Sequence, residues 1–374
     1  MPTARGWAVA ACGAALLTLG VVWDYRELAV LGAAALLVVA LAVALARPPG
    51  RIAVHRRPAA SRVAPGGSVA VDVTLSADGR RRFPRLAERV AGLGEERMID
   101  LPDAGAAGSV RYRLAAGRRG VLELGPVQAR RSDPFGLAAA TRRYGGTDRV
   151  WVHPRWTPLR SLPVGRVPDP DGVLDGAKSG NLTFHALRDY VLGDDLRHVH
   201  WRSSARQGRL VVREYIDTSH ARIALLVDDR GAADGRDGLD AVAEAAASVA
   251  VTALRSGLRC DLRLVSGAAR DGAAGVHRLL DLLAEAEPTP EADLARTCRA
   301  LRTRRAGDTV VLVSAGLSDD DLRVFAELRD CCPGLVAVLL GPASGRVAPS
   351  GVTVLPARDP ADFVRRWNEA PWAR

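Results

Sequence analysis

The chain has 374 residues, of which 48% are apolar and 25% charged, so it is long enough for two or three domains with real cores. This composition excludes a chain that is disordered throughout. The net charge of +10 comes almost entirely from arginine, with Lys178 as the one lysine, and only 5% of the residues are aromatic. Nucleic-acid binding favours aromatic residues interleaved with cations, so we expect no nucleic-acid partner.

The cysteines predict a reducing environment. None of them forms a Cys-x-x-Cys motif, and the adjacent Cys331 and Cys332 suit neither a metal site nor an easy disulfide. We therefore expect reduced thiols, which are typical of a protein that faces a reducing compartment. The cysteines are Cys12, Cys260, Cys298, Cys331 and Cys332.

Two uncharged apolar stretches open the chain, one from Gly6 to Trp23 and one from Leu28 to Ala46. Each approaches the ~20 residues that a helix needs to cross a bilayer, and the polar residues 24–27 separate them. The pattern predicts two transmembrane helices within residues 1–50. A cleaved signal peptide is the alternative, but the sequence around Trp23 lacks a small-x-small cleavage site.

The arginines predict how this hairpin is oriented. Arg5 precedes the first stretch, and Arg47, Arg51, Arg56 and Arg57 follow the second, whereas the connecting DYRE turn carries a net negative charge. Lys and Arg are retained on the cytoplasmic side of a membrane. We therefore expect a protein of the cell (inner or plasma) membrane whose soluble domains lie in the cytoplasm.

Residues 51–156 have the pattern of a small β-sandwich-like domain. Apolar and polar residues alternate over 69–75, 110–114 and 121–129, and Gly, Pro and Asp residues separate these runs. Residues 133–136 (DPFG) predict a turn with a packed aromatic ring, which we favour over a binding role for this turn.

The next part of the chain, residues 157–220, combines a connector with a dense cluster of charges. Residues 157–178 are rich in Pro, Gly and Asp without periodicity, which is typical of a linker or a long ordered loop. The cluster follows at residues 187–215 (LRDYVLGDDLRHVHWRSSARQGRLVVREY), and the apolar run RIALLVDD comes after it at residues 222–229.

Residues 221–374 predict an α/β domain, because strand and helix patterns alternate regularly and imply a parallel sheet covered on both faces. The expected strands are 222–229, 260–266, 309–315, 335–341 and 352–356. The expected helices are 239–255, 276–287, 291–304, 319–330 and 360–370.

The charged cluster resembles the signature of the domain-of-unknown-function family numbered fifty-eight. The matching residues are Gly180, Phe184, Leu187, Arg188, Tyr190, Gly193, Asp194, Arg197, Trp201, Ser204, Ala205, Arg206, Leu210, Val212, Arg213 and Glu214. The resemblance implies a von Willebrand A-like (Rossmann-type) fold for the α/β domain. It also implies a MoxR-type AAA ATPase as partner, in the assembly or maturation of other proteins at the membrane, without indicating the client protein or a reaction.

A metal-binding domain of this type carries an Asp-x-Ser-x-Ser loop after its first strand, because a hard cation needs clustered oxygen ligands at the carboxyl end of the sheet. Here that loop begins Asp228, Asp229, Arg230. Both serines are missing, Arg230 brings its own positive charge, and Ala315 stands where a later strand would supply a carboxylate. The sequence therefore predicts no metal site and no other cofactor, with Asp228 and Asp229 as helix-capping or partner-binding groups.

Within the signature, the favoured interpretation is a folded contact surface and not a catalytic centre. Asp194 and Asp195 are expected to accept hydrogen bonds from Arg188, Arg197 or Arg202, with Trp201 as a buried anchor. The residues predicted to bind a partner are Arg188, Tyr190, Gly193, Asp194, Asp195, Arg197, Trp201, Arg206 and Arg213.

Two alternatives remain open. Asp194, Asp195, His198 and His200 could form a metal or acid-base cluster, which would make the chain a divalent-metal-dependent binding protein or enzyme. The chain could also be a cell-wall-linked structural protein exposed outside the cell. We favour a membrane-anchored cytoplasmic adaptor or scaffold that is not an enzyme and contacts the lipid bilayer, the ATPase and a client protein.

Overall fold

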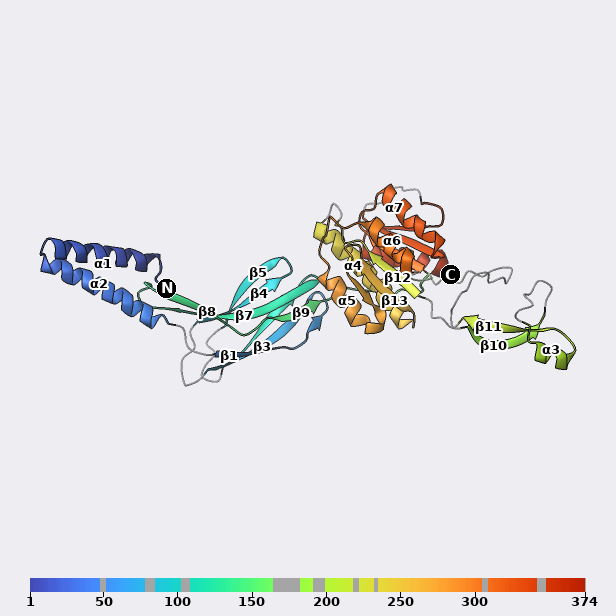
Figure 1. Cartoon of the computed structure of the whole chain (residues 1–374), viewed down its shortest axis with the longest axis horizontal. Coiled ribbons are helices and arrows are strands. Elements are labelled where there is room, and N and C mark those ends of the chain that lie inside the picture. Colours follow the sequence, from blue (N-terminus) through green and yellow to red (C-terminus); the bar gives the residue numbers. More distant parts are fainter. Residues whose placement is uncertain are drawn as a thin grey trace. The chain divides into compact units, whose positions relative to one another are not determined.

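The computed structural model divides the chain into two compact units, Met1–Pro154 and Arg155–Arg374, which are described separately (Figure 1). The residues described are 1–47, 52–77, 85–101, 108–163, 182–190, 199–217, 222–231, 235–304, 309–341 and 348–373.

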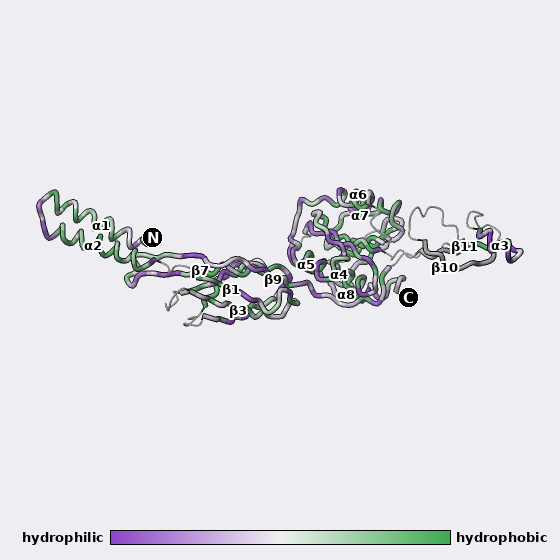
Figure 2. The backbone as a smooth tube through the Cα atoms, turned by 60° about the horizontal axis from the view of Figure 1, so that its bottom comes forward, coloured by the Kyte–Doolittle hydropathy of each residue, from purple (hydrophilic) through white to green (hydrophobic). Residues whose placement is uncertain are grey.

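Two long apolar helices begin the first unit, α1 (Ala4–Val22) and α2 (Arg26–Leu45). Figure 2 shows both helices as largely hydrophobic and the turn between them as hydrophilic. Most of their side chains are not buried, and the few buried positions are mainly glycine. A Cβ atom at Gly32 would lie 2.4 Å from the Leu17 backbone nitrogen, so glycine is needed for this close packing.

Two mainly antiparallel β-sheets form the rest of the first unit. The smaller sheet has the order β1-β3-β6, and the larger has the order β2-β9-β7-β4-β5, with β8 paired to β7. The strands are β1 (Ile52–Pro58), β2 (Arg62–Val63), β3 (Gly67–Ala77), β4 (Arg85–Gly92), β5 (Glu95–Leu101), β6 (Ser109–Ala116), β7 (Gly120–Ser132), β8 (Ala139–Tyr144) and β9 (Asp148–Val152).

The inward residues of both sheets share one apolar core, which includes Val71 of β3, Leu124 of β7 and Val150 of β9. The β-rich pattern predicted from the sequence is therefore present. One charged group also points inward, because Glu88 of β4 is fully buried and pairs with Arg56 of β1.

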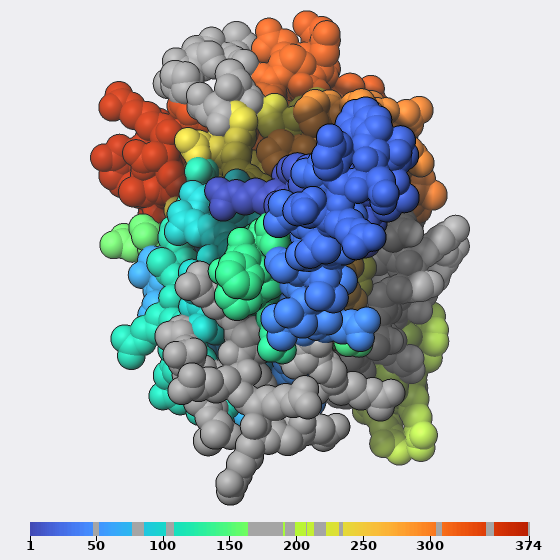
Figure 3. Space-filling model, turned by 90° about the vertical axis from the view of Figure 1, so that its left-hand side faces the viewer, coloured from blue at the N-terminus to red at the C-terminus, as the bar shows by residue number. Residues whose placement is uncertain are grey.

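The DPFG turn joins β7 to β8, as predicted, but its aromatic ring is not packed. Phe135 is 71% exposed, and it is the Asp133 side chain that is buried. The turn lies against the start of α1, since the Thr3 backbone nitrogen donates to the Leu137 carbonyl oxygen at 2.8 Å. In Figure 3 the green residues of this region adjoin the blue helices.

The second unit is built on a six-stranded sheet of order β14-β13-β12-β15-β16-β17. All neighbouring strands are parallel except β14, which is antiparallel at one edge. The strands are β12 (Arg222–Val227), β13 (Arg259–Leu264), β14 (Ala269–Asp271), β15 (Thr309–Ser314), β16 (Gly334–Leu340) and β17 (Thr353–Ala357). The short β14 was not predicted, and β17 at the other edge contains Pro356.

Helices cover both faces of this sheet, which confirms the predicted mixed α/β architecture. Leu225 of β12 belongs to the core formed with α4, α5 and α8, whereas its neighbours Ala224 and Leu226 belong to the core formed with α6 and α7. The helices are α4 (Gly235–Arg255), α5 (Val276–Glu285), α6 (Leu294–Arg304), α7 (Asp319–Ala326) and α8 (Pro360–Glu369), with short 3-10 turns η2 (Gly272–Ala274), η3 (Glu327–Asp330) and η4 (Pro371–Ala373).

The first residues of the connector are an ordered strap on this unit. The Leu159 backbone nitrogen donates to Thr252 Oγ1 of α4 at 3.1 Å, and Trp367 Nε1 of α8 donates to the Ser161 carbonyl oxygen at 2.9 Å. Residues 164–178 lie outside the described residues. The sequence was compatible with either a linker or an ordered loop for residues 157–178. The described part, residues 157–163, is an ordered loop.

All five cysteines are free, as predicted. Burial raises the pKa of the Cys260 thiol to about 12, and it has the same effect on Cys298. Both thiols are therefore protonated at neutral pH and unreactive.

Candidate functional site

The strand order of the second unit changes direction between β12 and β15, and ligands of parallel α/β sheets bind beside the carboxyl ends of strands at such a point. Asp228, Asp229 and Arg230 directly follow β12, and Ser314 ends β15. We call these four residues, together with Asp321 of α7, the carboxyl-edge cluster.

Arg230 is the centre of the cluster. Its Nε and Nη2 atoms each donate to one carboxylate oxygen of Asp228 at 2.9 Å, and its Nη1 atom donates to Asp321 Oδ1 at 2.9 Å. Ser314 Oγ donates to Asp228 Oδ2 at 2.7 Å. The hydrogen bonds to Asp228 raise the pKa of Arg230, so the guanidinium stays charged.

Asp321 is held by its position in α7. Ser318 caps this helix and forms a reciprocal capping box with Asp321, which places the carboxylate at the positive end of the helix. Burial alone raises the pKa of Asp321, but hydrogen bonds from Arg230 and Ser318 outweigh it and lower the pKa. Asp321 is therefore the ionised partner that joins α7 to the loop after β12.

Asp229 points to the other side of the loop. It is 1% exposed, and its Oδ1 atom accepts a hydrogen bond from the Ser266 backbone nitrogen at 2.9 Å. Its carbonyl oxygen accepts from the Thr289 backbone nitrogen at 2.6 Å. Burial raises the pKa of this carboxyl group and outweighs the hydrogen bonds from Ser266, and the charge of Asp228 adds to the rise.

The arrangement places an internal cation between two carboxylates. Arg230 thus lies directly beside Asp228, between its carboxylate and that of Asp321. Within the described ranges, no group of three or more His, Cys, Asp or Glu side chains is arranged to hold a metal ion. Sequence reasoning identified Asp228, Asp229 and Arg230 but missed Ser314 and Asp321, although the Ser-x-x-Asp capping pattern at 318–321 was readable.

The signature segment forms a separate β-hairpin. Strand β10 (Leu182–Asp189) pairs antiparallel with β11 (Val211–Asp217), and the short helix α3 (Trp201–Gln207) lies in the connection between them. Arg188 and Arg213 lie on these two strands, opposite Val212 and Leu187. The hairpin brings the two ends of the signature together, which the sequence alone did not predict.

His200 and its neighbouring serines hold α3 in place. His200 Nδ1 accepts a hydrogen bond from the Ser203 backbone nitrogen at 3.1 Å and so caps the helix. Ser204 Oγ accepts from the Val211 backbone nitrogen at 2.9 Å. Gly193, Asp194, Asp195, Arg197 and His198 lie outside the described residues, so the predicted carboxylate pairs cannot be placed.

Trp201 is 64% exposed, and the prediction that it is a buried anchor is wrong. It is the first residue of α3, and it does not belong to a described apolar core. Arg206 is exposed on the same helix, whereas Tyr190 is half-buried and its backbone nitrogen donates to the Leu210 carbonyl oxygen at 3.0 Å.

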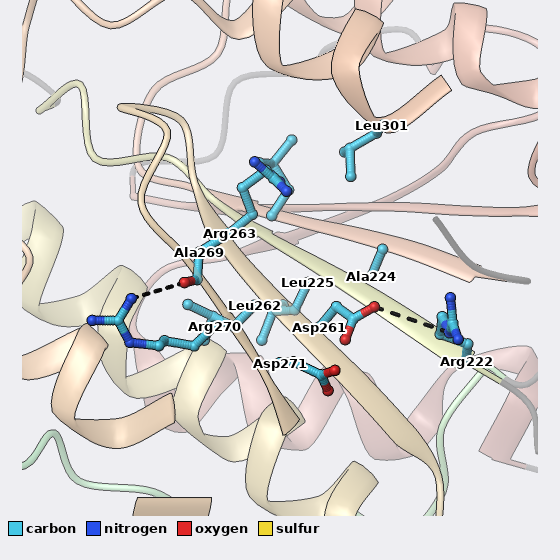
Figure 4. A pocket seen from close by; sticks show the side chains of 11 residues that line it. Arg222, Ala224, Leu225, Asp261, Leu262, Arg263, Ala269, Arg270, Asp271 and Leu301 are labelled. Atoms are coloured by element: carbon cyan, nitrogen blue, oxygen red, sulfur yellow. Dashed lines mark hydrogen bonds and ion pairs between the residues drawn. The ribbon is translucent and has the colours of Figure 1, made fainter. Parts of the chain in front are cut away.

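A cavity lies along β12, β13 and β14, away from the carboxyl-edge cluster. This cavity of about 450 Å³ is lined by Arg222, Asp261, Arg263, Asp271 and Leu301, among others (Figure 4). Burial raises the pKa of Asp261, and the negative charge of Asp271 adds to this effect. The charges lining the cavity are mixed, so they do not select one class of ligand.

The described fold defines a mixed α/β protein with two apolar helices at its N-terminus and several β-sheets. Residues 186–350 match the family described as "Protein of unknown function DUF58", which confirms the family resemblance for this part of the chain. The chain is also 27% identical over 157 residues to the uncharacterized protein YeaD of Bacillus subtilis (strain 168), a match that covers 40% of this chain and 37% of that protein.

Solved structures give weaker similarities. The CARDB domain of the PF1109 protein from Pyrococcus furiosus, solved with di-metal ions, is 14% identical, with a TM-score of 0.19 over 27% of this chain and 92% of that chain. The DNA glycosylase AlkC from Pseudomonas fluorescens is 13% identical, with a TM-score of 0.20 over 36% of this chain and 41% of that chain. These scores are too low to carry an argument about fold or function.

Proposed function

We propose that this chain is a membrane-anchored adaptor or scaffold whose soluble units lie in the cytoplasm. It acts with a MoxR-type AAA ATPase in the assembly or maturation of other proteins, and its α/β unit is of the von Willebrand A type. The proposal rests chiefly on the exposed Trp201 within the segment that matches the family.

Membrane insertion is supported by α1 and α2, which are long and apolar enough to cross a bilayer and have mean hydropathies of 1.6 and 2.9. In the part of the chain that the structure describes, Arg5 and Arg47 flank the two ends of the hairpin that lie together. The positive-inside rule puts these ends in the cytoplasm. A reporter enzyme fused after Arg374 should then be active only inside the cell, whereas activity outside would favour a cell-wall-linked protein.

A protein-contact role is supported by other exposed residues in and shortly after α3. Leu210 is 40% exposed, and Arg202 and Arg206 are exposed on α3. Tryptophan and arginine are the residues most enriched among those that dominate binding energy at protein interfaces. An apolar ring left in water among arginines is therefore the strongest described candidate for a partner-binding surface.

The carboxyl-edge cluster supports a contact role that does not need a metal ion. In a metal-dependent binder the cation itself provides the charge at this edge of the sheet. Here Arg230 provides a fixed positive charge and already engages Asp228 and Asp321. The doubly wound strand order of the unit supports the von Willebrand A type.

The test is capture of the ATPase from detergent extracts of cells that produce the tagged full-length chain. We expect Trp201→Ala to weaken capture by about 30-fold, since truncating a dominant interface residue costs about 2 kcal/mol. Met98→Ala is the matched control, because Met98 is also an exposed apolar side chain (46%) but lies on β5 of the first unit. Undiminished capture by Trp201→Ala would show that α3 is not the contact surface.

A further inference from the structure

The DPFG turn contacts both ends of the helical hairpin. On the α1 side, Thr3 Oγ1 donates to the Gly136 carbonyl oxygen at 2.7 Å and accepts from the Gly6 backbone nitrogen at 3.2 Å. Gly6 permits this approach, since a Cβ atom there would lie 2.0 Å from the Leu137 carbonyl oxygen. The turn is therefore fixed at the first residues of α1.

The same turn also contacts the end of α2. Ala138 is fully buried in a small apolar cluster with Ala42 and Ala46. Beside it, Arg131 Nη1 donates to the Arg47 carbonyl oxygen at 3.5 Å. The start of α1 and the end of α2 both lie at this turn. The DPFG turn is therefore level with the outer ends of the two apolar stretches.

The turn holds Phe135 in a defined position. Asp133 is 4% exposed, its Oδ2 atom accepts from the Phe135 backbone nitrogen at 2.8 Å, and its Oδ1 atom accepts from the Ala138 backbone nitrogen at 2.5 Å. A buried carboxylate thus fixes the backbone on both sides of Phe135. The ring nevertheless points away from the protein, with 71% of its surface exposed.

The surroundings of Phe135 have the composition of a membrane interface. Trp7 is 64% exposed one turn into α1, and the side chains of Arg5, Arg47 and Arg131 are exposed. Aromatic rings are favoured at the level of lipid headgroups, and arginine pairs well with lipid phosphates. An exposed phenylalanine that a buried aspartate fixes at this level is best explained by contact with lipid.

We infer that the DPFG turn is a membrane-contact site of the β-rich domain, in which Phe135 inserts among the headgroups of the leaflet that the hairpin enters. The exposed arginines beside it face the phosphates of anionic lipids. The inference rests on the proposed membrane insertion of α1 and α2. Beyond the helical hairpin, the Phe135 side chain then provides a second attachment that holds the β-rich domain against the bilayer surface.

The experiment is photo-crosslinking of the full-length chain in vesicles that contain phosphatidylglycerol and phosphatidylethanolamine. A benzophenone-bearing phenylalanine analogue replaces Phe135, Trp7 or Met98 in three separate proteins. Met98 is the negative control, because its partner Arg89 on β4 lies level with β7 residues 124–127. That level is at least five residues from Ser132, or roughly 17 Å along the strand.

We expect lipid adducts, detected by mass spectrometry, at positions 7 and 135, with a yield at 135 at least five times that at 98. Adducts at position 7 without adducts at 135 would overturn the inference and leave membrane insertion intact. An absence of lipid adducts at both 7 and 135 would contradict membrane insertion itself. Adducts between position 135 and a protein, without lipid, would also overturn the inference.

Discussion

Arg56 and Glu88 form an ion pair in which both side chains are almost completely buried, at 3% and 0% exposure. The second carboxylate oxygen of Glu88 accepts a hydrogen bond from Tyr112 Oη at 2.6 Å, and Arg56 Nη1 donates to Asp148 Oδ2 at 2.7 Å. The pair joins β1 of one sheet to β4 of the other. It is therefore the polar connection at the centre of the first unit.

Glu88→Ala should lower the local stability of this unit by about 3–5 kcal/mol, because it leaves a buried guanidinium without its buried counter-charge. Hydrogen exchange of β1 and β4 peptides in the full-length chain measures this change. Glu123→Ala is the matched control, since Glu123 pairs with Arg149 at exposures of 37% and 60% and should contribute less than about 1 kcal/mol. Equal effects of the two substitutions would contradict the importance of the buried pair.

Arg230→Gln should destabilise the second unit by about 2–4 kcal/mol, because the buried Asp228 carboxylate loses its cation while keeping the hydrogen bond from Ser314. Hydrogen exchange in β12 and α7 is the measurement. Arg236→Gln, which breaks an exposed pair with Glu287, should change it by less than about 1 kcal/mol. Unchanged exchange in Arg230→Gln would show that the cluster does not hold these elements together.

Divalent cations distinguish the adaptor from the metal-dependent alternative. We expect Mg²⁺, Mn²⁺ or Zn²⁺ to leave the unfolding temperature of the full-length chain unchanged, because Arg230 already pairs with both Asp228 and Asp321. A native-state ligand at 100 times its Kd would add about 2.7 kcal/mol of stability. A clear rise in unfolding temperature with any of these ions would favour the metal-dependent function.

Asp229 and Asp321 should affect the pH dependence of stability with opposite signs. Burial raises the pKa of Asp229, so the folded state holds the proton more tightly, and this carboxyl group reduces stability as pH rises above its unfolded value of about 3.9. Asp229→Asn should then increase stability at neutral pH. The pKa of Asp321 is lowered, so its contribution is present at neutral pH and is lost on acidification, and Asp321→Asn should decrease stability there.

The two variants are compared by thermal unfolding between about pH 4 and about pH 7, a range that begins near the ordinary carboxyl pKa. Asp229→Asn should flatten the loss of stability towards neutral pH. If both substitutions move stability in the same direction at neutral pH, the opposite roles of the two carboxyl groups are wrong.

Trp367→Ala should cost about 3–5 kcal/mol, because the ring is fully buried between Phe363 and Trp372. Trp367→Phe keeps most of the apolar area but removes the hydrogen bond to the Ser161 carbonyl oxygen, and it should cost about 1–2 kcal/mol. Proteolysis of the strap at residues 155–163 measures the second effect. Faster cleavage is expected in Trp367→Phe, and unchanged cleavage would contradict the role of this bond.

The α/β unit was the most predictable part of the fold. Its strands are buried on both faces and therefore appear in the sequence as apolar runs such as 309–314, and its helices show a clear apolar side. The short β14 carries no such pattern, because its residues are Ala, Arg and Asp at an edge. It was missed for that reason.

The β-rich domain was predicted only in outline. In β4 the inward residues are Leu86, Glu88 and Val90, and the glutamate hides the alternation of apolar residues. Its partner Arg56 lies on β1, so the pairing depends on tertiary structure and has no local signal. The prediction for Trp201 was wrong in the opposite sense, because an apolar residue was expected to be buried. A large ring normally indicates burial, but this ring lies at the surface.

The borders of the six-stranded sheet restrict how this protein can associate. At one border β14 offers a backbone of only three residues, and at the other β17 includes Pro356, which has no N–H group to donate. Neither border is suited to templating an additional strand from another polypeptide. Pairing of another strand onto this sheet is thereby disfavoured, and recognition of other chains by the six-stranded sheet and its helices depends on side chains.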